Sequence, residues 1–77
     1  MEFQGKEVKI SIHAVERAEL RGIAYPFQIH EVILTGKLTR IGKHILKFVK
    51  KGKGGCIICI CEDVGDEIIV KTVERRT

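Results

Sequence analysis

The sequence is short of aromatic residues and of long apolar runs. Tryptophan is absent, and only one tyrosine and three phenylalanines occur among 77 residues. A surface on which nucleic-acid bases stack is therefore not expected. The longest uninterrupted apolar run, residues 56–61, is far shorter than a helix that crosses a bilayer. No charged segment followed by an apolar stretch marks a signal peptide, so we expect a cytoplasmic protein with no membrane segment.

Cysteine is also scarce, and its three occurrences fall within that one apolar run, at Cys56, Cys59 and Cys61. On an extended strand Cys59 and Cys61 share one face while Cys56 points to the other, so the three cannot converge on a metal ion without a bend. We interpret them as small buried side chains rather than as a metal or redox site, and expect no metal and no cofactor.

Acidic residues are missing from the middle of the chain. None occurs between Glu31 and Glu62, whereas seven basic residues do: Lys37, Arg40, Lys43, Lys47, Lys50, Lys51 and Lys53. The formal net charge of +4 is therefore concentrated in one segment, whose field attracts polyanions over a distance of about 10 Å. The alternative is a solvated lysine-rich hairpin that only keeps a small domain soluble.

What the chain does contain is apolar residues, 44% of the total, enough for one small core. Residues 1–77 are predicted to form a single domain. A helix is expected over residues 12–21, capped by Ser11, and a second from Pro26 to Gly36. Alternating segments then predict strands near residues 40–41, 44–50, 56–62 and 67–74, with a short strand also conceivable at residues 7–10. The predicted fold is α+β, with two N-terminal helices packed on an antiparallel sheet of three to four strands.

The second helix is expected to be largely buried, because Phe27, Ile29, Val32, Ile33 and Leu34 cover most of its circumference. His30 falls within this apolar arc, so we interpret it as a core or boundary histidine.

Two helices cover only one face of such a sheet. In the last strand, Ile68, Val70 and Thr72 are predicted to oppose Ile69, Lys71 and Val73. The uncovered face is expected to keep the side chains of Ile45, Val49 and Cys59 or its neighbours, with Lys47 and Lys71 among them. An open face that is half apolar and half basic suggests a partner, a homodimer or a nucleic acid.

The most distinctive pattern lies in the first predicted helix, where His13, Arg17 and Arg21 are spaced four residues apart and form one stripe. A histidine and two guanidinium groups suit a phosphate or a carboxylate. His13 lies in the first turn, where the positive end of the helix dipole favours a neutral imidazole that can act as a general base. The alternative is structural, with His13 paired to Glu16 or Glu67 and the arginines covering the sheet edge.

This stripe carries a family resemblance. The segment His13-Ala-x-x-Arg17-x-x-x-Arg21-Gly22-Ile23, followed by Ile29-x-x-Val32-Ile33-x-x-Gly36 and later by Val70-Lys-Thr-Val73, resembles the family called domain of unknown function 4258. The match covers about residues 8–74, and its specific part is the first helix. That family is similar to the BrnT- and RelE-like ribonuclease toxins in the order of its elements.

The resemblance implies a metal-independent RNA endonuclease of a toxin–antitoxin system, with an antitoxin protein as partner and with His13, Arg17 and Arg21 as catalytic residues. In such toxins basic residues of the last strand and tail lie along the RNA, which implies this role for Lys71, Arg75 and Arg76. The basic segment adds four more candidates for RNA binding: Lys43, His44, Lys47 and Lys50. The alternative function is a non-catalytic module of the same fold that binds RNA or protein.

Overall fold

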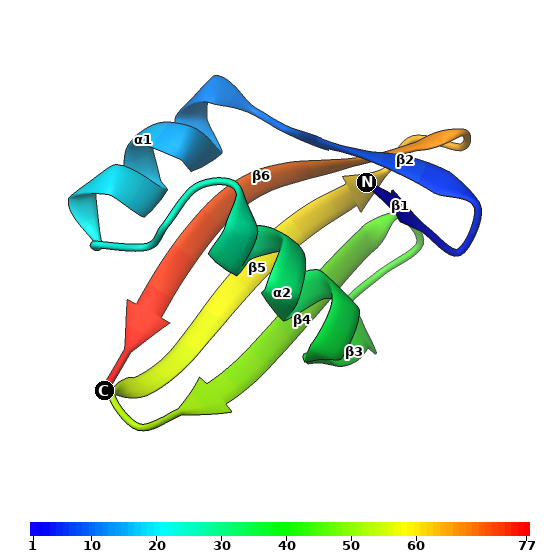
Figure 1. Cartoon of the computed structure of the whole chain (residues 1–77). Coiled ribbons are helices and arrows are strands. Elements are labelled where there is room, and N and C mark those ends of the chain that lie inside the picture. Colours follow the sequence, from blue (N-terminus) through cyan, green and yellow to red (C-terminus); the bar gives the residue numbers. More distant parts are fainter.

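A computed structural model describes all 77 residues as two short helices against one face of a curled six-stranded sheet (Figure 1). The elements in chain order are β1 (Glu2–Phe3), β2 (Lys6–Ile10), α1 (Ile12–Leu20), α2 (Phe27–Thr35), β3 (Lys37–Arg40), β4 (Ile45–Gly52), β5 (Gly55–Asp63) and β6 (Glu67–Arg76). The strands lie in the order β1-β2-β6-β5-β4-β3. Neither helix is long and apolar enough to cross a membrane.

The predicted sheet of three to four antiparallel strands behind two N-terminal helices is wrong. Two strands precede α1, and β2 pairs with β6 in parallel, so that Val8 lies opposite Ile68 and Ile10 opposite Val70. The other neighbouring strands pair antiparallel. Local sequence could not show this arrangement, because the two partners of the parallel pair come from opposite ends of the chain and β1 has only two residues.

The core lies between the sheet and the helices. Its largest fully buried side chains include Phe48 and Leu46 from β4 and Ile29 and Ile33 from α2. Cys59 and Cys61 are fully buried in it, as expected of small apolar side chains, so Cys59 does not lie on the open face. On α1 the buried residues are Ala14 and Ala18, whose small side chains let the helix approach the sheet closely.

The predicted faces of β6 are wrong beyond Val70. Cys61 lies opposite Val70, but the preceding Ile60 lies opposite Thr72, so Lys71 is an extra residue without a direct partner. Such a bulge moves every later side chain to the other face. Val73 therefore joins the core, and Thr72 lies on the same side of the sheet as Ile60.

The helix ends follow the sequence closely. The amide of Ala14 donates a hydrogen bond of 3.1 Å to the Ser11 hydroxyl, the predicted cap of α1. α2 ends at Gly36, as predicted, but it is buried only on the side of Ile29, Val32 and Ile33. Phe27 and Leu34 are exposed, which corrects the expectation of a largely buried helix. Its apolar arc is wider than the surface that the sheet offers to it.

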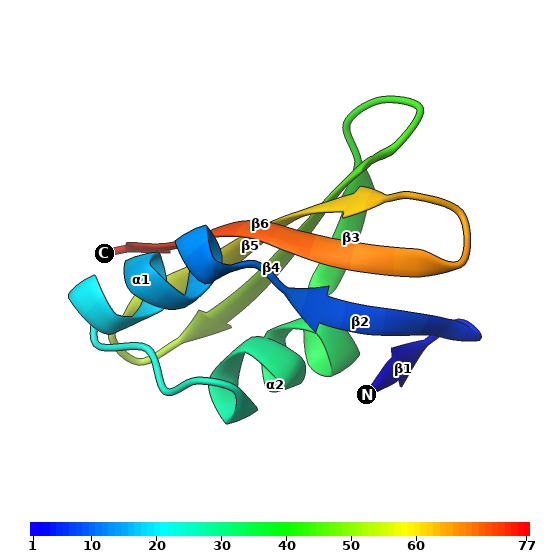
Figure 2. The same cartoon turned by 90° about the horizontal axis from the view of Figure 1, so that it is seen from above.

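The long strands give the sheet two distinct ends. At one end lie the β4–β5 hairpin, the end of β6 and the C-terminal part of α1 (Figure 1). At the other lie the β5–β6 turn and the β3–β4 loop, since Ile45 at the start of β4 lies opposite Glu62. Figure 2 shows both helices on one side of the sheet, with the other side uncovered.

Candidate nucleic-acid interface

The first two residues of the predicted catalytic stripe are in contact. Arg17 Nε donates a hydrogen bond of 3.4 Å to His13 Nε2 on the exposed surface of α1. The alternative pairing of His13 with Glu16 or Glu67 is not formed, because Glu67 instead bonds Lys9 at 2.8 Å. A ring nitrogen that accepts a hydrogen bond carries no proton, so Nε2 is the basic atom of this imidazole. His13 and Arg17 together thus present a base beside a fixed positive charge.

The third residue of the stripe, Arg21, closes the C-terminus of α1, where Arg75 of β6 meets it. Arg75 Nε donates to the Arg21 carbonyl oxygen at 3.2 Å, and Arg75 Nη2 donates to that of Gly22 at 3.4 Å. The last carbonyls of a helix lack partners within the helix and carry the negative end of its dipole. The guanidinium satisfies both, and it joins the last strand to the end of the stripe.

Arg75 also adjoins the lysine-rich hairpin. The register places Lys50 of β4 and Arg75 of β6 on the same face, on either side of Ile57. A Cβ atom added to Gly54 in the hairpin turn would lie 3.8 Å from Arg75 Nη1. Lys50 donates a hydrogen bond of 2.6 Å to the Thr35 hydroxyl at the end of α2. The stripe and the acid-free segment, far apart in sequence, therefore meet at one end of the sheet.

A hollow of about 220 Å³ opens between α2 and this hairpin. Four cationic side chains line it, those of Lys50, Lys51, Lys53 and Arg75, with Glu31 as the one carboxylate. We call Arg17, Arg21, Lys50, Lys51, Lys53, Arg75 and Arg76 the basic end of the molecule. None of these seven residues makes an ion pair. Their charge is left for an external anion.

The remaining predicted RNA-binding residues lie elsewhere. Lys43 and His44 belong to the β3–β4 loop at the opposite end of the sheet. Lys47 lies on the uncovered face, opposite Ile60 and Thr39. Lys71 is already paired with Glu62, at 3.7 Å. Of the seven residues, the structure thus gathers only Lys50, Arg75 and Arg76 near the end of the stripe.

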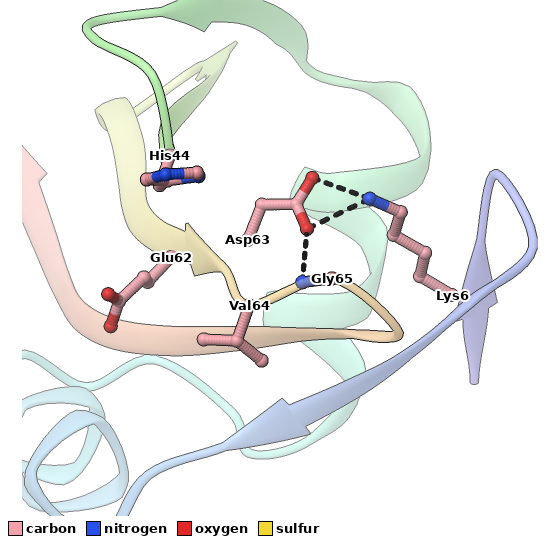
Figure 3. Close-up of a pocket in the computed structure, with 6 residues that line it drawn as sticks. All are labelled: Lys6, His44, Glu62, Asp63, Val64 and Gly65. Carbon is pink, nitrogen blue, oxygen red and sulfur yellow. Dashed lines mark hydrogen bonds and ion pairs between the residues drawn. The ribbon is translucent and has the colours of Figure 1, made fainter.

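A second hollow, of about 520 Å³, lies at that opposite end (Figure 3). Lys6 Nζ bonds both carboxylate oxygens of Asp63, at 2.8 and 2.7 Å, and the Gly65 amide donates to one of them at 3.0 Å. The hydrogen bond from Lys6, followed by that from Gly65, lowers the pKa of Asp63. Figure 3 shows Glu62 turned away from Asp63. The charges of this hollow are therefore satisfied internally.

We call the residues around this hollow the paired end: Lys6, Lys9, Glu62, Asp63, Glu67 and Lys71. Three of the protein's four ion pairs link these residues, and the fourth joins the terminal amine to Glu7 nearby on β2. The Lys6–Asp63 pair spans 57 positions of sequence, so no local pattern indicated it. No group of three or more histidine, cysteine or acidic side chains is arranged to hold a metal ion.

Burial is the main cause of the pKa shifts of three further residues considered in the sequence analysis, His30, Cys59 and Cys61. His30 is half-buried, and burial, with a smaller effect of the terminal amine, lowers its pKa, which confirms a boundary histidine. Burial raises the pKa of Cys59 and of Cys61 to about 12. Both thiols are therefore protonated and unreactive at neutral pH.

The chain was compared with protein-family models, with curated proteins and with solved structures, and it matches none of them.

Proposed function

We propose that this protein binds single-stranded RNA along its basic end and cleaves it without a metal ion, as an endoribonuclease of the toxin type. The observation that carries the proposal is the junction at Arg75, which joins the His13–Arg17–Arg21 stripe to the lysine hairpin. Cations that no carboxylate neutralises, on a surface shared by a helix and a hairpin, suit an extended polyanion.

RNA is the favoured polyanion because it brings its own nucleophile, the 2′-hydroxyl group. A general base and a fixed cation then suffice for strand cleavage. His13 Nε2 takes the proton of the 2′-hydroxyl, whose oxygen attacks phosphorus while the bond to the 5′-oxygen breaks. The proton returns to the leaving 5′-oxygen. The products are a 2′,3′-cyclic phosphate and a 5′-hydroxyl end.

Arg17 is placed to stabilise the charge that grows on the phosphoryl oxygens, because its guanidinium already contacts the base. Along a helix, the eight residues from His13 to Arg21 span about 12 Å. A strand that follows α1 can therefore pass His13, Arg17 and Arg21 in turn and continue over Arg75 to the hairpin lysines.

A second candidate is RNA binding without cleavage. It is favoured by the same hydrogen bond from Arg17, since that bond occupies the lone pair that a general base must use. RNA must displace or rotate Arg17 before His13 can act. Both candidate functions require RNA binding, and they differ only in whether the bound RNA is cleaved.

The decisive experiment measures binding and cleavage of one fluorescent single-stranded RNA in the presence of EDTA. We expect His13→Ala to lower the cleavage rate by about 10²–10⁴-fold with affinity almost unchanged. Arg17→Ala is expected to weaken both. Lys9→Gln, which removes a charge at the paired end, serves as control. Binding without cleavage by the wild type supports the second candidate, and failure to bind RNA at low salt contradicts both.

A further inference from the structure

The hollow between α2 and the β4–β5 hairpin contains a carboxylate that the binding of phosphate groups does not explain. Glu31 lines this hollow together with four cationic side chains, yet it makes no ion pair with any of them. A negative charge beside a chain of phosphates opposes binding. The Glu31 carboxylate therefore suits a part of the ligand that offers hydrogen-bond donors and carries no negative charge.

The contacts at the end of α2 explain why this carboxylate has no lysine partner. Lys50 Nζ donates a hydrogen bond of 2.6 Å to the Thr35 hydroxyl, and that hydroxyl donates one of 2.8 Å to the backbone carbonyl of Glu31. The lysine is thus held by a neutral group. Glu31 is exposed, so both of its carboxylate oxygens can accept hydrogen bonds from a ligand.

A second side chain of α2 adds a donor beside these acceptors. Gln28 lies three residues before Glu31, hence one turn away on the same side of the helix, and it lines the same hollow. Gln28 Oε1 accepts a hydrogen bond of 2.6 Å from the Ala24 amide, which anchors the side chain. Its Nε2 amide group keeps its donors for a ligand.

We infer that this hollow is a subsite for one unpaired base of the bound RNA, and that the base is guanine. The inference rests on the proposed RNA binding. Unpaired bases are recognised by hydrogen bonds to their Watson–Crick edges. On that edge guanine has two neighbouring donor groups, N1–H and the N2 amino group, beside the O6 acceptor, whereas each other base has one donor group. The Glu31 oxygens match the two donors, and the Gln28 amide matches O6.

The rest of the hollow suits a single flat ring. No aromatic side chain lines it, but the planar guanidinium group of Arg75 does, and its bonds to the Arg21 and Gly22 carbonyls fix its position. Guanidinium planes stack on unpaired bases. The volume of about 220 Å³ is below the range of about 300–1,000 Å³ of pockets that hold drug-sized ligands, so the hollow fits a base better than a larger ligand.

The test measures the affinity of the full chain for short fluorescent oligouridine strands by anisotropy. One central position of each strand carries uracil, adenine, guanine or hypoxanthine, and 2′-O-methyl groups prevent cleavage. We expect the guanine strand to bind about tenfold more tightly than the uracil and adenine strands. Hypoxanthine keeps N1–H and O6 but lacks the N2 amino group, so the hypoxanthine strand should lose most of this advantage.

Glu31→Gln should abolish the preference for guanine, because its amide offers one acceptor and one donor to the two donor groups of the base. The loss of a negative charge should at the same time slightly raise the affinity for the uracil strand. Glu19→Gln is the matched control, since Glu19 is an exposed glutamate on α1 that makes no ion pair and does not line the hollow. It should keep the preference at about tenfold, and circular dichroism verifies that both variants are folded.

The outcomes separate this inference from the proposed function. Equal binding of all strands, preference for another base, equal binding of the guanine and hypoxanthine strands, or a guanine preference that survives Glu31→Gln would each overturn the guanine subsite and leave RNA binding standing. Failure of every strand to bind at low salt would overturn the proposed function together with the subsite.

Discussion

The two ends of the sheet use their charged residues in opposite ways. At the paired end, Lys6, Lys9 and Lys71 each meet a carboxylate within 4 Å, whereas at the basic end no lysine or arginine does so. Both ends are built from turns between the same long strands. The difference therefore comes from which segments the topology brings together, and not from the kind of structure at each end.

The origin of the difference is the parallel pairing of β2 with β6. It brings Lys6 and Lys9, from the start of the chain, beside Asp63 and Glu67, at the β5–β6 turn. The acidic residues that follow the acid-free segment, Glu62, Asp63 and Glu67, form ion pairs there. The β4–β5 hairpin, which lies inside that segment, has no acidic neighbours on its adjoining strands before Glu74. The order of the strands in the sheet thus explains both why the charges of one end are paired and why those of the other end are not.

The largest expected effect contrasts the glycines of the two turns. Gly55 at the basic end has φ +114°, and a Cβ atom there would collide with the backbone of Arg76. Gly65 at the paired end has φ +108° with open space around it. We expect Gly55→Ala to lower the free energy of unfolding by about 3 kcal/mol or more and Gly65→Ala by about 1–2 kcal/mol. Urea denaturation of both variants measures the contrast, and equal losses would contradict it.

The next effect concerns affinity. Replacing Lys51 and Lys53 together by alanine should weaken RNA binding at least about tenfold and reduce the slope of log K against log salt by about 1.4, or 0.7 for each lost phosphate contact with a single strand. The Lys6→Gln and Lys9→Gln double variant removes the same charge at the paired end. A salt titration by fluorescence anisotropy compares them. Similar slopes for the two variants would show that the ends do not differ as RNA surfaces.

A smaller effect is expected for the link between α1 and the basic end. Arg75→Gln removes the guanidinium that bonds the Arg21 and Gly22 carbonyls, and should lower the free energy of unfolding by about 0.5–1 kcal/mol. Arg76→Gln, one residue further on, has no such bond to lose and is the control. If Arg75→Gln also reduces RNA cleavage more than Arg76→Gln does, the junction positions the stripe. Equal behaviour of the two variants would show that the junction does not position the stripe.

The smallest expected effect depends on pH at the paired end. The bond from Lys6 lowers the pKa of Asp63 below its ordinary value of 3.8, so the stabilisation is complete above that value and is lost as the pH falls through the lower, folded-state pKa. Asp63→Asn should therefore be less stable than the wild type at neutral pH, and the difference should shrink below about pH 4. Thermal unfolding from pH 2 to 7 measures it, with Asp66→Asn as control. A difference that does not change with pH would exclude the ion pair as its cause.

Sequence reasoning succeeded where the determining contacts are local. The Ser11 cap, the two hairpin turns and the alternation of Leu46 and Phe48 with Lys47 depend on neighbours within a few residues. The short strand expected at residues 7–10 is present as β2, but its parallel pairing with the remote β6 was not predicted. The faces of β6 beyond Val70 were also predicted wrongly, because the extra residue Lys71 reverses them.

The candidate site likewise contains one local contact that could be predicted from the sequence and one remote contact that could not. Helical spacing was enough to bring His13 beside Arg17, since four residues make about one turn. The junction of Arg75 with the end of α1 joins residues more than fifty positions apart, and it could only be found in three dimensions. The exposure of Phe27 and Leu34 was also missed, because an apolar arc shows which residues can be buried and not how much surface awaits them.

The pairing of β2 with β6 also has a consequence for how the chain is made. During synthesis β2 emerges well before its partner residues, 67–70. The pairing of β2 with β6 is therefore deferred until those later residues have been made. Contacts of such long range slow folding. The nascent chain can form its helices and the β4–β5 hairpin early, and gains its paired end only after β6 has been made.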